Sequence, residues 1–86
     1  MATEQRTLTL TVYSRNACHL CEEMIAALRN LQGCFRFKIE VVDVDGDPAL
    51  ERLYGEKVPL LAHGRRELCH HALERAAVTA YLAEFR

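Results

Sequence analysis

The chain lacks the features that mark a membrane protein, a secreted protein or a nucleic-acid-binding protein. No apolar run approaches the roughly 18 residues of a membrane span. Residues 1–6 contain no hydrophobic segment of the kind that directs secretion. Eleven Lys and Arg against twelve Asp and Glu give a net charge of −1, so no basic field exists to attract nucleic acid or an anionic membrane. We therefore expect a cytoplasmic protein with neither kind of partner.

Internal repeats, linkers and low-complexity tracts are also missing from the 86 residues. A chain of this size buries only about 60–65% of its unfolded surface when it folds. Half of the residues are hydrophobic, so a single core is feasible. We expect one domain over residues 1–86.

Four cysteines are present, and in a cytoplasmic protein they indicate metal or redox chemistry rather than a disulfide framework. Two of them form Cys18-His19-Leu20-Cys21, directly after the strand-like run 8–13 and at the start of a helix-like run. A thiol at a helix start lies where unpaired backbone N–H groups and the helix dipole favour a thiolate. The motif therefore predicts dithiol–disulfide exchange.

The first half of the chain predicts a βαβ unit. Residues 7–13 alternate as a strand, and an apolar face with helical spacing then begins at Cys18. Gly33 follows the last periodic residue and predicts a left-handed cap at the helix end. Residues 35–44 alternate again as a second strand, which should run parallel to the first.

The second half predicts a short helix, a hairpin and a final helix. Asp47-Pro48 is typical of an N-cap and first helical position, Leu50, Leu53 and Tyr54 form an apolar face, and Gly55 ends the helix. Residues 58–69 predict a β-hairpin that turns at His63-Gly64, and the last helix begins from His71. The predicted element order is β-α-β-α-β-β-α.

This order separates the other two cysteines. A helix of about thirteen residues places Cys34 roughly 20 Å from Cys18, too far for a disulfide. Cys69, His70 and His71 would share an edge with Cys18 if the third strand is antiparallel to the first. Free cysteine is among the most buried residue types, so we interpret Cys69 as a small core residue, with a third redox thiol or a substrate contact as the alternative.

With these elements assigned, the chain resembles the thioredoxin superfamily, and within it the glutaredoxin-like proteins. The resemblance rests on the run from Tyr13 to Cys21, on Val42-Asp43-Val44-Asp45 and on Val58-Pro59, in matching order over nearly the whole chain. It implies an α/β thioredoxin-like fold with a four-stranded mixed sheet flanked by helices. It also implies that Pro59 is cis and faces the C-x-x-C, and that the backbone of Val58 pairs with an extended thiol substrate.

The expected function is thiol–disulfide oxidoreduction. Cys18 would attack a substrate disulfide, Cys21 would resolve the mixed disulfide, and His19 could stabilise the Cys18 thiolate. Arg15 occupies the position of a basic residue that glutaredoxins use near glutathione, whereas their Gly-Gly-x-Asp is replaced here by Leu68–Ala72. We expect no tightly bound cofactor, a disulfide-containing protein or small thiol as substrate, and glutathione as a possible reductant.

Two other function classes remain open. Cys18 and Cys21 could bind zinc with Cys69, His70 and His71, or an iron–sulfur cluster with glutathione, although a second C-x-x-C is missing. A redox-silent module could instead bind partners through the Val58-Pro59 groove. Asp43 and Asp45 are interpreted as a strand end and turn.

Overall fold

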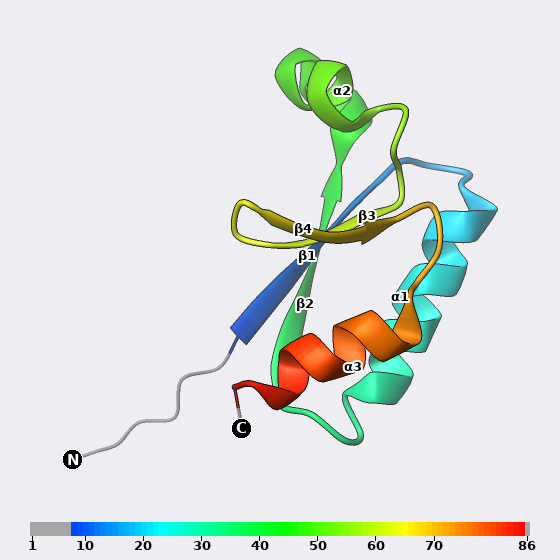
Figure 1. Ribbon diagram of the computed structural model, residues 1–86. Coiled ribbons are helices and arrows are strands. Elements are labelled where there is room, and N and C mark those ends of the chain that lie inside the picture. The colour runs from blue at the N-terminus through cyan, green and yellow to red at the C-terminus, as the bar shows by residue number, and fades with distance from the viewer. Residues whose placement is uncertain (1–7, 86) are drawn as a thin grey trace.

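The computed structural model describes residues 8–85 as a four-stranded sheet with three α-helices (Figure 1). The elements are β1 (Leu8–Ser14), α1 (His19–Leu31), β2 (Phe37–Asp43), a 3-10 turn η1 (Val44–Gly46), α2 (Pro48–Tyr54), β3 (Leu60–His63), β4 (Arg66–His70) and α3 (Arg75–Ala83). The predicted order β-α-β-α-β-β-α is confirmed. The expectations for residues 1–6 and for Thr7 as the first strand residue fall outside the described residues.

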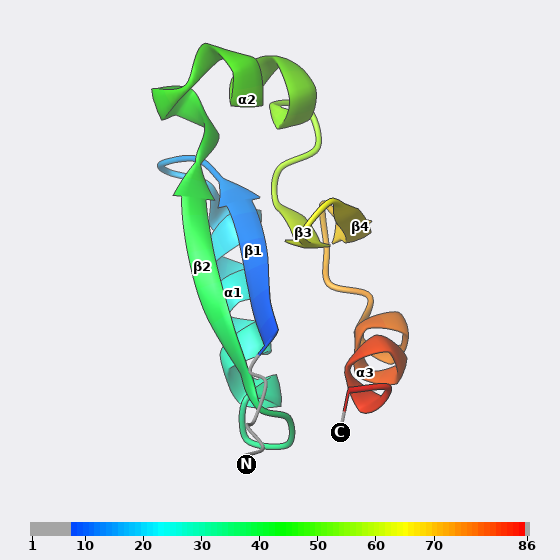
Figure 2. The ribbon, with the colours of Figure 1, turned by 90° about the vertical axis from the view of Figure 1, so that its left-hand side faces the viewer.

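The sheet has the strand order β2-β1-β3-β4. β1 and β2 are parallel, from Leu8 opposite Phe37 to Ser14 opposite Asp43, as the βαβ pattern predicts. Figure 2 shows the two strands side by side, both running toward α2. β3 is antiparallel to β1, with Leu60 opposite Tyr13, and β4 is antiparallel to β3. The carboxyl end of β1 and the start of β3 therefore lie at one edge of the sheet.

The core lies between one face of this sheet and the two helices α1 and α3. The apolar stripe of α1 predicted from its spacing is buried, and α3 adds a shorter stripe. Burying a leucine or valine side chain stabilises the fold by about 1.5–3 kcal/mol, so this layer fixes how α1 docks. The core cluster contains Leu10, Val12, Met24, Leu28, Leu31, Phe37, Leu61, Cys69, Val78 and Leu82.

α2 lies beyond the carboxyl ends of β1 and β2 (Figures 1 and 2). Asp47 is its N-cap, accepting from the N–H of Ala49 at 2.9 Å, and Pro48 is its first residue, as predicted. The expected apolar face is only partly used, because Leu53 is 64% exposed and no residue of α2 is buried. The ring of Tyr54 instead packs on Tyr13 of β1, with centroids 4.4 Å apart.

Three predicted boundaries are wrong. At the end of α1, Gln32 is the cap in right-handed conformation, and Gly33 does not adopt a positive φ. The N–H groups of Gly33 and Cys34 bond to the carbonyls three residues earlier, so the helix ends in a tight turn that needs no left-handed residue.

The hairpin turns one residue later than predicted, at Gly64 and Arg65, where Gly64 has a φ of 63° that glycine adopts without strain. α3 begins at Arg75 instead of His71, because the backbone of His71 has a φ of 70° and its N–H is bonded to Pro59. Within residues 8–85, no helix has the length and apolar character needed to cross a membrane.

Candidate active site

Cys18 and Cys21 form a disulfide at the start of α1, with their Cα atoms 5.2 Å apart. Cys18 is the N-cap of the helix, in extended conformation, and is half-buried, whereas Cys21 is 2% exposed. The N–H of Cys21 donates to Sγ of Cys18 at 3.1 Å. In the reduced protein the same N–H and the helix dipole would favour a thiolate on Cys18. The pair therefore consists of one partly exposed cysteine and one buried cysteine.

The loop from β1 to α1 positions Cys18 through an unusual backbone. Ala17 has a φ of 55°, in the left-handed region that residues other than glycine rarely adopt. Such a conformation costs an alanine about 1–2 kcal/mol, so the surrounding packing holds it in place. The turn it makes brings the chain from the strand end into the helix within the four residues that separate Ser14 from His19.

Arg15 lies beside this loop and is held by two carboxylates. Its Nη2 is 3.0 Å from Oε2 of Glu51 and 3.3 Å from Oδ1 of Asp45. Its Nε is buried and makes no hydrogen bond with any residue of the described part of the chain. Arg15 thus connects the loop before Cys18 to η1 and α2.

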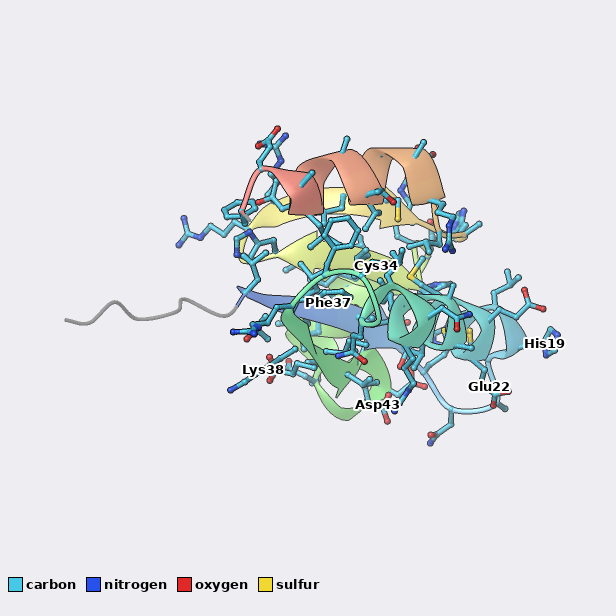
Figure 3. The ribbon with its side chains drawn as sticks, turned by 90° about the horizontal axis from the view of Figure 1, so that it is seen from below. His19, Glu22, Cys34, Phe37, Lys38 and Asp43 are labelled. Carbon is cyan, nitrogen blue, oxygen red and sulfur yellow. A yellow bond between two sulfur atoms is a disulfide. The ribbon has the colours of Figure 1, made fainter. Side chains whose placement is uncertain are left out.

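His19 is at the outer end of α1 and points away from the body of the molecule (Figure 3). Its side chain is 82% exposed, and its Nε2 lies 2.8 Å from Oε2 of Glu23, one helical turn on. Cys34 lies at the other end of α1, exposed and unpaired, so it takes no part in the disulfide.

The peptide bond between Val58 and Pro59 is cis. Pro59 is buried, and the strand pairing of β3 begins only at the following residue, Leu60. Val58 therefore precedes the β-ladder, at the sheet edge from which the chain enters α1. The carbonyl of Pro59 accepts the N–H of His71 at 2.7 Å, which ties the end of β4 to this segment.

The end of β4 contains the fourth cysteine and one histidine, and a second histidine follows the strand. Cys69 is 6% exposed and belongs to the core cluster, which confirms its interpretation as a core residue. Burial raises the pKa of its thiol. Nδ1 of His70 donates to Oε2 of Glu67 at 2.7 Å, and this bond lowers the pKa of the Glu67 carboxyl. Nε2 of His71 donates to the carbonyl of Glu56 at 2.9 Å.

His71 also lines a groove of about 200 Å³ beside the first turns of α1. The expectation that the end of β4 approaches the C-x-x-C helix is met by His71, whereas Cys69 turns into the core. Leu20 and Glu23 lie on the other wall, which α1 forms, and no motif of the sequence marked them as binding residues. Leu20 could have been noticed as an apolar residue off the apolar stripe of its helix.

The metal alternative finds no ligand set in this part of the chain. Within residues 8–85, no three side chains of His, Cys, Asp or Glu come together in a way that could hold a metal ion. His70 and His71 have rings 4.7 Å apart, but they bond to Glu67 and to the Glu56 carbonyl respectively.

Comparison with known proteins identifies a matching family and several solved structures with a similar fold. Residues 9–83 match the family model of the glutaredoxin-like domain (DUF836). The chain is 46% identical to protein Ne2328 from Nitrosomonas europaea, over 95% of this chain and 99% of that one, with a TM-score of 0.82. A protein from X. campestris is 34% identical over 87% and 96% of the two chains, with a TM-score of 0.72.

A malarial protein shares the fold at 18% identity and a TM-score of 0.63, over 93% of this chain and 98% of that one. No curated protein sequence matches the chain at a significant level.

Proposed function

The chain belongs to the glutaredoxin-like domain family, and we propose that it is a thiol–disulfide oxidoreductase in which Cys18 attacks and Cys21 resolves. The observation that carries the proposal is the asymmetry of the pair. Cys18 is partly exposed at the helix N-terminus, and Cys21, three residues further on, is 2% exposed. A nucleophile has to reach its substrate, whereas a resolving thiol has only to reach its neighbour.

The exchange proceeds in two balanced steps. The Cys18 thiolate attacks one sulfur of a substrate disulfide, which forms a mixed disulfide and releases the first substrate thiolate. Cys21 then loses its proton to solvent and attacks Sγ of Cys18, which forms the Cys18–Cys21 disulfide and releases the second thiolate. Two electrons pass from the dithiol to the substrate, and two equivalents of a reducing thiol would restore the dithiol by the reverse exchange, which releases the oxidised thiol as a disulfide.

Val58 and Pro59 support a substrate groove in this mechanism. Because the β-ladder starts at Leu60, the peptide groups of Val58 precede the pairing of β3 and could bond to an extended substrate segment. The backbone N–H of His71 donates to the carbonyl of Pro59 and stabilises this segment. Such a groove would align a substrate disulfide with Cys18.

The experiment is a redox titration with cysteine mapping. The metal-free protein is equilibrated in glutathione buffers of varied potential, the thiols are trapped, and their states are read by mass spectrometry. We expect reversible formation of the Cys18–Cys21 disulfide. Cys18→Ser should abolish reduction of a disulfide substrate, and Cys21→Ser should accumulate a mixed disulfide on Cys18. Cys34→Ser is the matched control, since its thiol is exposed but lies at the far end of α1.

The alternatives give different results in the same experiment. Thiols that stay reduced at every potential would overturn the proposal. Loss of bound zinc or iron in Cys18→Ser would favour the metal site, and full partner binding by Cys18→Ser without turnover in the wild type would favour a redox-silent module.

A further inference from the structure

The groove beside α1 has an apolar lining that the exchange chemistry alone does not require. Five of its seven lining residues are apolar, and the two polar ones are Glu23 and His71. Leu20, which lies between the two cysteines, is 49% exposed. An exposed leucine at the mouth of a groove loses contact with water when an apolar side chain covers it. The lining consists of Leu20, Glu23, Met24, Ala27, His71, Ala72 and Leu73.

Each wall of the groove belongs to a segment that also contributes to the proposed reaction centre. On one wall, Leu20 belongs to the same helical turn as Cys21. On the other wall, His71 bonds through its backbone to the carbonyl of Pro59. The groove is thus bounded by the helix that begins at the disulfide and by the residue that is bonded to Pro59.

The charges at this edge of the molecule do not suit an anionic substrate. Arg15 is bound to Asp45 and Glu51, and Nζ of Lys57 lies 3.4 Å from Glu67. The groove itself is lined by no lysine or arginine. Arg15 and Lys57 therefore already have carboxylate partners.

Carboxylates, in contrast, are in surplus on α1. Glu22 makes no ion pair with any residue of the described range 8–85, and Glu23, whose partner is His19, lines the groove. Fixed charges of this kind attract ligands of opposite sign and repel those of like sign. Glutathione disulfide has more carboxylates than ammonium groups, so it would bring negative charge to a negative surface.

Resting on the proposed function, we propose that this groove selects protein disulfides in which an apolar and a cationic side chain flank the cysteine, and that it disfavours glutathione disulfide. The apolar side chain is covered by Leu20 and Leu73, and the cation is held by Glu23, whereas Glu22 lies on another face of α1 (Figure 3). The exchange itself is unchanged; the groove decides which disulfides it acts on.

The test measures the rate at which the reduced protein reacts with a matched series of disulfides. Three of the disulfides are made from capped tripeptides, each linked to a second copy of itself through a central cysteine. In each peptide a leucine follows the cysteine, and the residue before it is arginine, glutamine or glutamate. Glutathione disulfide and the neutral bis(2-hydroxyethyl) disulfide complete the series. Each rate constant is divided by that of dithiothreitol with the same disulfide, which removes differences in intrinsic reactivity.

We expect the arginine peptide to react about tenfold faster than the glutamate peptide. This difference should shrink in about 0.5 M salt, because salt screens the interaction between Glu23 and the charged side chain of the peptide. Glu23→Gln should reduce the ratio to about threefold, with Glu84→Gln at the C-cap of α3 as the matched control that keeps it. Leu20→Ala should slow the glutamine peptide about fivefold, with the exposed Leu53→Ala on α2 as its control.

Equal normalised rates for the three peptides would overturn the inference and leave the oxidoreductase standing. So would glutathione disulfide reacting as fast as the arginine peptide. If not even bis(2-hydroxyethyl) disulfide were reduced, the proposed function would fail and the inference with it.

Discussion

The backbone N–H of His71 donates a 2.7 Å hydrogen bond to the carbonyl of Pro59. The imidazole of the same residue donates to the carbonyl of Glu56. His71 therefore fastens the end of β4 to the segment that leads into β3, and it does so with a φ of 70°. The segment around Pro59 and the groove beside α1 therefore meet at this residue.

His71→Ala should lower the free energy of unfolding by about 1 kcal/mol, because the side-chain bond is lost while the unfavourable φ remains. His71→Gly should be the less destabilising of the two, since glycine adopts this φ without strain. Urea denaturation of both variants measures the difference. A glycine variant less stable than the alanine variant would contradict this account of the backbone.

Ala17→Gly should raise the free energy of unfolding by about 0.5–1 kcal/mol, because relief of the left-handed strain exceeds the entropy that glycine adds to the unfolded chain. Thermal or urea unfolding of the oxidised protein measures it. The matched control is Ala26→Gly in α1, where right-handed helical backbone makes glycine unfavourable by about 1 kcal/mol. The two substitutions should have opposite signs, and equal signs would rule out strain at Ala17.

Arg15→Gln tests whether this side chain serves the fold or the substrate. If the bonds to Asp45 and Glu51 are its main role, unfolding should become easier by about 0.5–1 kcal/mol, and less so at high salt. The rate with glutathione disulfide should change less than about threefold, since the guanidinium is already paired. A tenfold loss of that rate, with stability unchanged, would instead support the sequence-based prediction that Arg15 binds the substrate.

Because Cys69 is buried, we expect the free energy of unfolding to decrease as the pH rises into the alkaline range. Burial raises the pKa of its thiol in the folded state above the ordinary value of 9.0. Below that value both states keep the proton and the stabilisation is complete. As the pH rises, the unfolded thiol ionises first, so stability falls until the folded thiol also ionises. The pKa of Tyr13 is also raised above its ordinary value of 10.0, first by burial and then by the proximity of Tyr54 and Glu40. Tyr13 therefore adds to the loss of stability at alkaline pH.

The test measures the urea concentration at the midpoint of unfolding between about pH 7 and 10. The protein is oxidised and contains the substitution Cys34→Ser. Cys69→Ala should be less stable at pH 7 by about 1–2 kcal/mol because of the cavity it leaves, and should lose less stability toward pH 10. Parallel pH curves for the two proteins would show that Cys69 does not titrate differently on folding.

Much of the fold follows from local pattern. The apolar stripe of α1, the alternation of β1 and β2 and the Asp47-Pro48 cap each specify one element through contacts within a few residues, and all three are found. The error at the start of α3 falls where a long-range bond competes with local preference. His71 is compatible with a helix start by sequence, but its bond to Pro59, twelve residues away, holds it outside α3.

The candidate site divides in the same way. Spacing and periodicity act locally, so the sequence was enough to predict the C-x-x-C at a helix start, the βαβ order and the separation of Cys34 from Cys18. The core position of Cys69 followed from the usual burial of free cysteine. Two features depended on tertiary contacts: Arg15 is bound by Asp45 and Glu51, and Leu20 and His71 line one groove. Those partners are brought together by the docking of helices on the sheet, which depends on the whole core at once and leaves no periodic signal in the chain.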